Sequence, residues 1–319
     1  LLDRADIDAV IIATTDVWHC RITLDALAKG KHVYVEKPMV YKIDEGYKVI
    51  QAQKNSNKIL QVGSQRVSSL GLAKAKELLA AGEIGKLNMV NAVYDRQSSI
   101  GAWEYTIPKD ASAMSTDWDR FVEATGKMEF DAKKFFWWRA FKEVGTGVAG
   151  DLFIHLLSGT HFVTNSLGPQ TIVSTGQFSH WKDGRNLPDV MAGTMQYGDT
   201  AEHPAFQLTL QVNFISGTGG QEVTRFIGSE GVMDVKGNNI SIKHSILPEA
   251  PGFGGYDSVF TFSKSMQEEM QKEYDAKWSE SQKKRPLKED ITFKPPTGYN
   301  EHLDHFTNFF VDRSPHRMF

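Results

Sequence analysis

Two clusters of polar side chains have types and spacings suited to chemistry. The first is the run Glu36-Lys37-Pro38, in which a carboxylate, an ammonium group with three donors and a proline that fixes the backbone follow one another. The second is Asp151 and His155, whose four-residue spacing predicts one shared helix face, with Cβ atoms about 5–6 Å apart. A carboxylate beside an imidazole can orient it and raise its basicity. The pair therefore indicates a general base that works near neutral pH.

Each cluster also has a structural interpretation. Glu36 and Lys37 can be a solvated pair in a loop. Asp151 can be favoured by the dipole at a helix N-terminus, with His155 as a packed helix residue. We favour chemistry because a buried strand precedes Glu36 and because two such clusters occur in one chain.

The elements that position the first cluster alternate between strands and helices. Short apolar runs rich in β-branched residues predict buried strands. We expect strands at residues 7–13, 32–35 and 59–63, and helices at residues 17–29, 43–54 and 70–81. This alternation predicts parallel βαβ units. Ligands bind at the carboxyl ends of such strands, which is where Glu36-Lys37-Pro38 lies.

From Lys86 onward the strands follow one another without helices between most of them, which predicts an antiparallel sheet. A glycine-rich turn, Gly145-Thr146-Gly147, precedes the helix that carries Asp151 and His155. We therefore place a domain boundary near residue 86. We expect strands at 86–94, 171–178, 190–197, 205–215, 221–227, 232–235 and 240–244, and helices at 151–164, within 262–289 and at 301–310.

Composition excludes several classes of protein. In 319 residues, 40% are hydrophobic and 24% charged, so the chain can build a sizeable core. The net charge of −3 gives no strong attraction to nucleic acid or to an anionic membrane. The single cysteine, Cys20, excludes an internal disulfide framework, and no apolar run reaches the roughly 18 residues of a membrane span. We expect a cytoplasmic protein, unless a missing N-terminal segment carries an export signal.

The order of motifs resembles one enzyme family. A strand, Ala13-Thr14, His19, Gly30-Lys31-His32-Val33 and Glu36-Lys37-Pro38 are similar to the Gfo/Idh/MocA family of nicotinamide-dependent sugar oxidoreductases. The resemblance implies that residues 1–86 are the C-terminal part of a dinucleotide-binding Rossmann domain. It implies that residues 87–319 are a substrate-binding domain with a large open antiparallel sheet, which forms homodimers or tetramers. The family's G-x-G-x-x-G turn and closing helical segment are not in this sequence, so we expect both ends to be truncated.

The resemblance also implies an activity and a set of site residues. The family transfers a hydride between NAD or NADP and the carbinol carbon of a sugar, glycoside or cyclitol. Lys37 would hold the reacting hydroxyl, Asp151 would orient substrate and His155, and His155 would remove the carbinol proton. The family's cofactor-binding positions correspond to Thr14, Thr15, Trp18, His19, Glu36, Lys37, Pro38, Gln65 and Arg66. Its substrate-binding positions correspond to Lys37, Asp151, His155 and Tyr299. Apart from the resemblance, the run Trp137-Trp138-Arg139 indicates a sugar-like ligand, because indole faces stack on sugar rings and a guanidinium donates to hydroxyls, so we expect Trp138 and Arg139 to bind substrate as well. In the family the peptide bond before the proline is often cis.

Several of these residues can instead have purely structural roles. Thr14 and Thr15 can cap a helix, and His19 is a lone histidine, which is more often structural. Gln65 and Arg66 can belong to a surface loop, and Trp138 can be a core residue. Glu301, His302 and His305 have spacings typical of a wet helix face, so we expect no metal site.

Two alternative functions remain open. The first is a glycosidase that cleaves by transient oxidation with a retained NAD. The second is a non-catalytic sugar-binding subunit whose cofactor site is vestigial.

Overall fold

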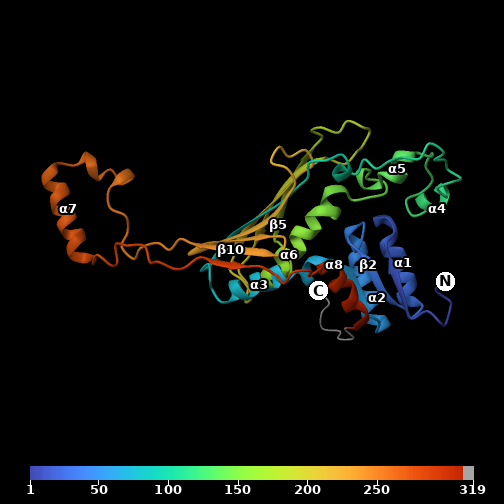
Figure 1. The fold of residues 1–319 in the computed structure, drawn as a ribbon, viewed down its shortest axis with the longest axis horizontal. Coiled ribbons are helices and arrows are strands. Elements are labelled where there is room, and N and C mark those ends of the chain that lie inside the picture. The colour runs from blue at the N-terminus through green and yellow to red at the C-terminus, as the bar shows by residue number, and fades with distance from the viewer. Residues whose placement is uncertain (312–319) are drawn as a thin grey trace.

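The computed structural model describes residues 1–311, which form two β-sheets and the helices that cover them (Figure 1). The smaller sheet is parallel, with the order β1-β2-β3, and consists of β1 (Ala9–Ile12), β2 (His32–Glu36) and β3 (Leu60–Gly63). Ile12 pairs with Val35, which pairs with Val62, so the three carboxyl ends meet at one edge. The βαβ prediction is confirmed for this part of the chain.

Two helices connect these strands. They are α1 (Asp16–Ala28) and α2 (Ile43–Ser56), which pack against each other. Gly30 follows α1 with a φ of +71°, a left-handed conformation that ends helices and favours glycine. Val33 and Val35 on one face of β2 are fully buried and Tyr34 on the other face is 5% exposed, as a strand covered on both faces requires.

The larger sheet has eight strands in the order β11-β10-β9-β8-β4-β7-β6-β5. Its strands are β4 (Leu87–Asp95), β5 (Thr171–Gln177), β6 (Val190–Tyr197), β7 (Phe206–Asn213), β8 (Gln221–Gly228), β9 (Gly231–Lys236), β10 (Asn239–His244) and β11 (Ile291–Phe293).

This sheet is not purely antiparallel. Within residues 1–311, β4 and β7 are its one parallel pair, and the other neighbours are antiparallel. Parallel neighbours need a crossover connection, which here contains α6 (Ile154–Thr164) and the β5–β6 hairpin. Alternation along a strand does not reveal its neighbours, so the sequence did not predict this pair or the short β11.

One face of the large sheet carries α6 and α3 (Leu70–Ala80), which pack against each other. Leu72 of α3 and Leu156 of α6 join Leu208 and Phe226 of the sheet in one buried core. A π-helical turn, η4 (Ala149–Phe153), leads directly into α6. The helix that carries the second polar cluster is therefore fixed on a rigid sheet.

The chain returns to the small sheet at its described end. Helix α8 (Glu301–Val311) lies against β3 and the short helix η1 (Gln65–Ser68). Phe306 and Phe309 meet the ring of Tyr34 edge to face, at centroid distances of 5.4 and 5.8 Å. The amphipathic pattern that predicts this helix reflects that contact.

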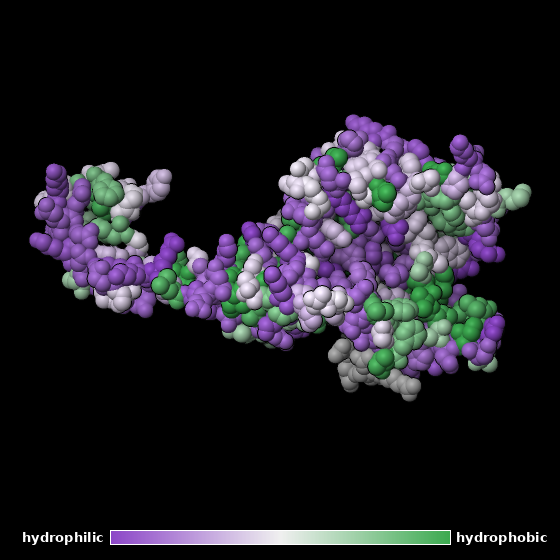
Figure 2. All heavy atoms as spheres, in the orientation of Figure 1, coloured by the Kyte–Doolittle hydropathy of each residue, from purple (hydrophilic) through white to green (hydrophobic). Residues whose placement is uncertain are grey.

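Two long segments lie outside the sheets. Residues 96–148, which we call the excursion, contain α4 (Trp118–Val122) and α5 (Ala132–Phe136) and cover the region beside α1 (Figure 1). Residues 245–290 form an arm that carries α7 (Lys264–Lys277) far from the rest of the molecule, with apolar patches on its surface (Figures 1 and 2). None of the α7 residues is buried.

None of the helices within residues 1–311 is both long and apolar enough to cross a membrane.

Candidate active site

Lys37 and Asp151 form an ion pair across the two halves of the chain. Lys37 follows β2 and Asp151 lies in η4, and the ammonium donates to Asp151 Oδ1 at 2.6 Å and to the Asp151 carbonyl at 3.1 Å. Both side chains are largely buried, at 14% and 13% exposure. Burial by itself would raise the pKa of Asp151, but the Lys37 and Arg139 charges outweigh it and hold that pKa below its usual value. Asp151 is therefore a carboxylate at neutral pH.

Arg139 extends this pair into the excursion. Its Nε donates to Asp151 Oδ1 at 3.1 Å, and its guanidinium lies 4.2 Å from the ring centroid of Trp138. The stacked geometry is that of a cation–π contact. Two predicted substrate-binding residues, Trp138 and Arg139, thus join the predicted catalytic residues in one cluster.

His155 is the second residue of α6 and is 9% exposed. Its Nδ1 is buried without a hydrogen-bond partner among the described residues. Burial, and then the charge of Lys37, lowers the pKa of His155 to about 3. The imidazole is therefore neutral at physiological pH and can accept a hydrogen bond. The expectation that Asp151 raises the basicity of His155 is not met overall, because burial and the Lys37 charge outweigh the carboxylate.

Within the described chain no hydrogen bond joins Asp151 to His155, although their spacing suggested one helix face. Asp151 lies in a π-helical turn, where backbone hydrogen bonds run from i to i+5. Asp151 contacts Lys37 and Arg139 instead, and it acts on His155 through its charge.

The glycine-rich turn packs directly against the first cluster. Gly147 has a φ of +59°, and a Cβ on Gly150 would lie 1.9 Å from Thr146 Oγ1 and 3.2 Å from Pro38 Cγ. The backbone of Thr146 donates to Asp16 Oδ2 at 2.9 Å, which connects the turn to the start of α1. Glycine is required at position 150 because a Cβ would overlap the Thr146 side chain, and the approach to Pro38 is tight as well.

A cleft of about 820 Å³ opens beside this cluster. It is lined by the carboxyl ends of β1 and β2, the start of α1 and the excursion. Its lining includes these predicted residues: Thr14, Thr15, Trp18, His19, Glu36, Lys37, Trp138 and Arg139.

Among the residues after β1, some side chains hold the structure together through hydrogen bonds and one hydroxyl has no partner in the described chain. His19 ring nitrogens lie 2.7 Å from the Pro38 carbonyl oxygen and 3.2 Å from that of Thr14, so His19 joins the two loops. Trp18 donates its indole N–H to the Phe121 carbonyl at 3.1 Å. Thr15 precedes α1 but makes no capping bond, and its buried hydroxyl has no partner in the described chain. An orphaned hydroxyl at the cleft is a position that a ligand can satisfy.

The Lys37–Pro38 peptide bond is cis, as the family resemblance implied. Glu36 pairs with Gly63 across β2 and β3, and a Cβ on Gly63 would lie 3.0 Å from the Glu36 carboxyl carbon. The tight approach leaves the carboxylate at the strand ends, where it lines the cleft.

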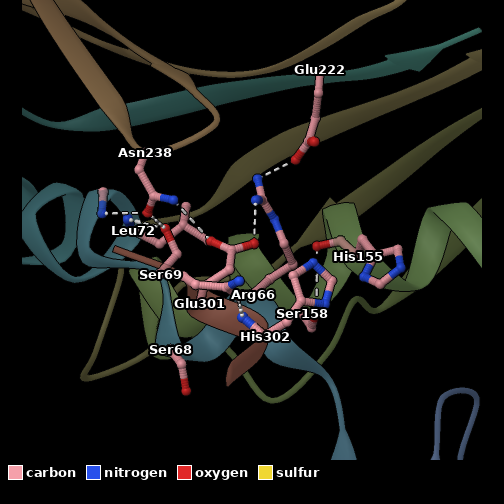
Figure 3. Close-up of polar contacts among 12 residues, drawn as sticks. Arg66, Ser68, Ser69, Leu72, His155, Ser158, Glu222, Asn238, Glu301 and His302 are labelled. Atoms are coloured by element: carbon pink, nitrogen blue, oxygen red, sulfur yellow. Dashed lines mark hydrogen bonds and ion pairs between the residues drawn. The ribbon is translucent and has the colours of Figure 1, made fainter. Parts of the chain in front are cut away.

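Arg66, a predicted cofactor residue, takes part in a buried ionic network (Figure 3). Its guanidinium pairs with Glu222 of β8 and lies 3.0 Å from Glu301 of α8. Glu301 also accepts from Asn238 at 3.1 Å. Arg66 therefore connects three elements. Neither Arg66 nor its half-buried neighbour Gln65 lines the cleft.

Tyr299 lies outside the cleft lining and connects the start of α8 to η1. Its hydroxyl donates to the Ser68 carbonyl, and burial, with Asp304 nearby, raises the pKa of Tyr299 to about 12. His305 contacts Ser68 Oγ at 3.0 Å and the Val62 carbonyl at 3.0 Å. Among residues 1–311 no three His, Cys, Asp or Glu side chains are grouped as metal ligands would be.

Sequence reasoning missed part of the cleft. Asp16 and several side chains of the excursion also line it: Tyr105, Thr116, Asp117, Arg120, Phe121, Phe135 and Phe136. Asp16 could have been noticed because it is a carboxylate directly after Thr14-Thr15. The excursion shows no strand or long helix pattern, so the sequence did not place it against α1.

Comparison with known proteins identifies the first part of the chain. Residues 1–64 match the model of the Gfo/Idh/MocA oxidoreductases, described as an oxidoreductase family with an NAD-binding Rossmann fold. An inositol 2-dehydrogenase of Salmonella paratyphi B is 31% identical over 110 residues, which are 34% of this chain and 32% of that protein. A scyllo-inositol 2-dehydrogenase (NAD(+)) of Bacillus subtilis is 37% identical over 86 residues, 27% of this chain and 25% of that protein. The matches thus span about a third or less of these relatives.

Solved structures share the fold over more of the chain. A levoglucosan dehydrogenase in complex with NADH and levoglucosan has a TM-score of 0.57 at 18% identity, covering 76% of this chain and 58% of that one. An inositol dehydrogenase homologue of Azotobacter vinelandii, complexed with NADH and myo-inositol, has a TM-score of 0.57 at 19% identity, covering 79% and 59%. At such identities the likeness establishes the fold.

Proposed function

We propose that this chain, whose residues 1–64 match the model of the Gfo/Idh/MocA oxidoreductases, acts as an NAD(P)-dependent dehydrogenase of a sugar, glycoside or cyclitol. One observation carries this proposal. Lys37, from the small sheet, and Asp151, from the large one, meet at 2.6 Å beside a cleft. A cation held by a buried carboxylate is suited to orienting a hydroxyl group and stabilising negative charge on its oxygen.

The residues present fit the nicotinamide half of a dinucleotide. The cleft lies at the carboxyl ends of β1 and β2, and the Thr15 hydroxyl there has no partner within residues 1–311. Thr14, Thr15, Trp18 and Glu36 would hold this half. NAD or NADP, when bound, supplies the hydride acceptor.

The remaining roles belong to side chains of this chain. Lys37 donates to the reacting hydroxyl and stabilises the oxygen as the carbonyl forms. Asp151 fixes the position of Lys37 through its 2.6 Å bond. His155, neutral and without a partner at Nδ1 among the described residues, accepts the hydroxyl proton.

The test is NAD(P)H formation by the full-length protein, followed at 340 nm with a panel of cyclitols and sugars. We expect turnover with at least one polyol and a loss of about a hundredfold or more in Lys37→Ala. Lys48→Ala is the matched control, because Lys48 is 59% exposed and pairs with Asp44 on the surface of α2. Equal rates in Lys37→Ala and Lys48→Ala would exclude Lys37 from the reaction.

The large sheet supports a further part of this proposal. All seven residues of β5 are exposed, including Ile172 and Val173 at 59% and 63%. Exposed apolar residues on an edge strand favour association. We propose that this sheet mediates homo-oligomerisation. Light scattering of Ile172→Lys against the unchanged protein tests it, and an unchanged mass would contradict it.

A further inference from the structure

The excursion gives the cleft an aromatic lining that the proposed chemistry does not use. Tyr105, Phe121, Phe135 and Phe136 all line the cleft together with Trp138. Phe121 and Phe135 lie 4.7 Å apart between ring centroids, and Phe135 and Phe136 lie 5.0 Å apart. We call these four residues the aromatic wall, and within it the rings of Phe121, Phe135 and Phe136 are in contact. They are exposed or half-buried, so they are open to a ligand.

The aromatic wall is held in place at both ends. Trp18 of α1 donates to the Phe121 carbonyl at 3.1 Å, and Trp137 donates to the Tyr105 carbonyl at 2.6 Å. Arg21 of α1 also pairs with Glu123 at 3.0 Å. A binding surface fixed before the ligand arrives loses less conformational entropy on binding.

The aromatic wall continues from the polar cluster. Trp138 follows the wall residue Phe136 by two positions and stacks on Arg139, which bonds to Asp151 beside Lys37. A ligand whose reacting ring lies at Lys37 can therefore extend onto the wall. The cleft volume of about 820 Å³ falls at the upper end of the range for small-molecule sites.

The charges that line the cleft indicate a neutral ligand. Lys37, Arg120 and Arg139 are the three lining cations in the described chain, and Asp16, Glu36 and Asp117 are the three lining anions. The cations are already paired, since Lys37 and Arg139 contact Asp151 and Arg120 lies 3.2 Å from Asp117. A phosphate or carboxylate on the ligand would therefore have to displace an existing ion pair.

We propose that the aromatic wall binds a second sugar ring, so that the substrate is a neutral disaccharide and not a monosaccharide. The apolar faces of sugar rings pack on aromatic rings, while rim groups such as Arg120 donate to their hydroxyls. This inference rests on the proposed function, because the reacting ring has to lie at Lys37.

The test is calorimetric binding of matched ligand pairs to the full-length protein saturated with NADH. The disaccharides are maltose, cellobiose, lactose, sucrose and trehalose, and the partners are the methyl glycosides of glucose and galactose. We expect at least one disaccharide to bind about tenfold more tightly than its methyl glycoside. In Phe136→Ala this advantage should fall by about fivefold or more, with the methyl glycoside unaffected. Phe136→Leu keeps apolar bulk without a ring and carries the test if the alanine variant does not fold.

The control is Phe260→Ala, because Phe260 is 70% exposed on the arm. The inference falls if no disaccharide has an advantage, or if Phe136→Ala weakens NADH and not the disaccharide. Oxidation of methyl glycosides without any disaccharide advantage would leave the proposed function standing and overturn the second-ring site. If a disaccharide has the advantage but no sugar reduces NAD, the second-ring site would stand and the proposed function would be overturned.

Discussion

At the scale of single residues, His155 combines two properties that determine its behaviour. It is almost fully buried, and the cation of Lys37 has the largest effect of any charge on its pKa. Both disfavour the imidazolium form, which is why the pKa falls to about 3. A histidine held neutral in this way accepts hydrogen bonds over the whole physiological range. In the proposed reaction, a proton that so weak a base takes up would leave it quickly.

The depressed pKa of His155 predicts a pH dependence of stability. Between about pH 3 and pH 6.5 the unfolded chain binds a proton at this residue and the folded chain does not. The free energy of unfolding therefore decreases as the pH falls below about 6.5. At pH 5 His155 contributes a slope of about 1.4 kcal/mol per pH unit.

Urea unfolding of the unchanged protein and of His155→Gln between pH 7.5 and 4.5 measures this contribution. In His155→Gln the free energy of unfolding should fall less steeply with decreasing pH, and the difference in slope should correspond to about one bound proton. His180→Gln is the control. Parallel curves for the two proteins would contradict a pKa depressed by burial.

Chemistry-bearing residue types could be recognised from the sequence, but their partners could not. Lys37, Asp151 and Arg139 were each singled out, and the structure brings them together through one carboxylate. Whether these residues act in catalysis stays a prediction. Asp151 and His155 make no hydrogen bond in the described chain, because the Asp151 carboxylate bonds to Lys37 and Arg139 instead, and a four-residue spacing does not reveal such distant partners.

At the scale of elements, Arg66 connects three of them in a buried position. Its side chain is 11% exposed, and its partners Glu222 and Glu301 come from β8 and α8. Removing the cation leaves two carboxylates facing each other away from water. Loss of one member of a buried ion pair is strongly destabilising.

Arg66→Ala should therefore lower the free energy of unfolding by about 3–5 kcal/mol and release α8. Hydrogen exchange at residues 301–311 should speed up more than exchange in α6. Arg4→Ala is the control, because Arg4 pairs with Asp6 at 63% exposure and such pairs contribute about 0–1 kcal/mol. A loss no larger than that of the control would show that the network does not hold α8.

Most helices and strands could be predicted because they carry strong periodic patterns. The ends of β1, β2 and β3, and of β6 through β10, fall within a few residues of the sequence expectation. The parallel β4–β7 pair and the aromatic wall could not be predicted. Both depend on which distant segments lie together, and hydrophobic periodicity contains no such information.

At the scale of the whole molecule, the two sheets have separate cores. One core joins β1, β2 and β3 with their helices, and the other joins α3, α6 and the large sheet. The first ends at Leu60 and the second begins at Leu72. The boundary that the sequence places at residue 86 stays a prediction. Limited proteolysis tests where the two units separate.

The arm of residues 245–290 is the least integrated part of the described chain. Its two sides meet where Ala250 N–H donates to the Gln282 carbonyl at 3.0 Å, and Phe253 stacks on Tyr274 within the arm. Replacing residues 251–281 by Gly-Gly should shift the melting temperature of the body by less than about 3 °C. The same deletion should leave ligand affinity unchanged. A collapse of the cooperative transition would mean that the arm supports the body.

The proposed hydride transfer at the Lys37–Asp151 cluster connects the geometry of the two sheets to an activity. The most direct measurement uses a polyol with deuterium at each carbinol carbon and the full-length protein with NAD. We predict deuterium at C4 of the nicotinamide with net NADH formation, and at least about a hundredfold slower transfer in Lys37→Ala. Absence of deuterium in the nicotinamide with every polyol that the protein binds would contradict hydride transfer at this cluster. Deuterium exchange without net NADH would assign the site to a reaction that regenerates its own cofactor.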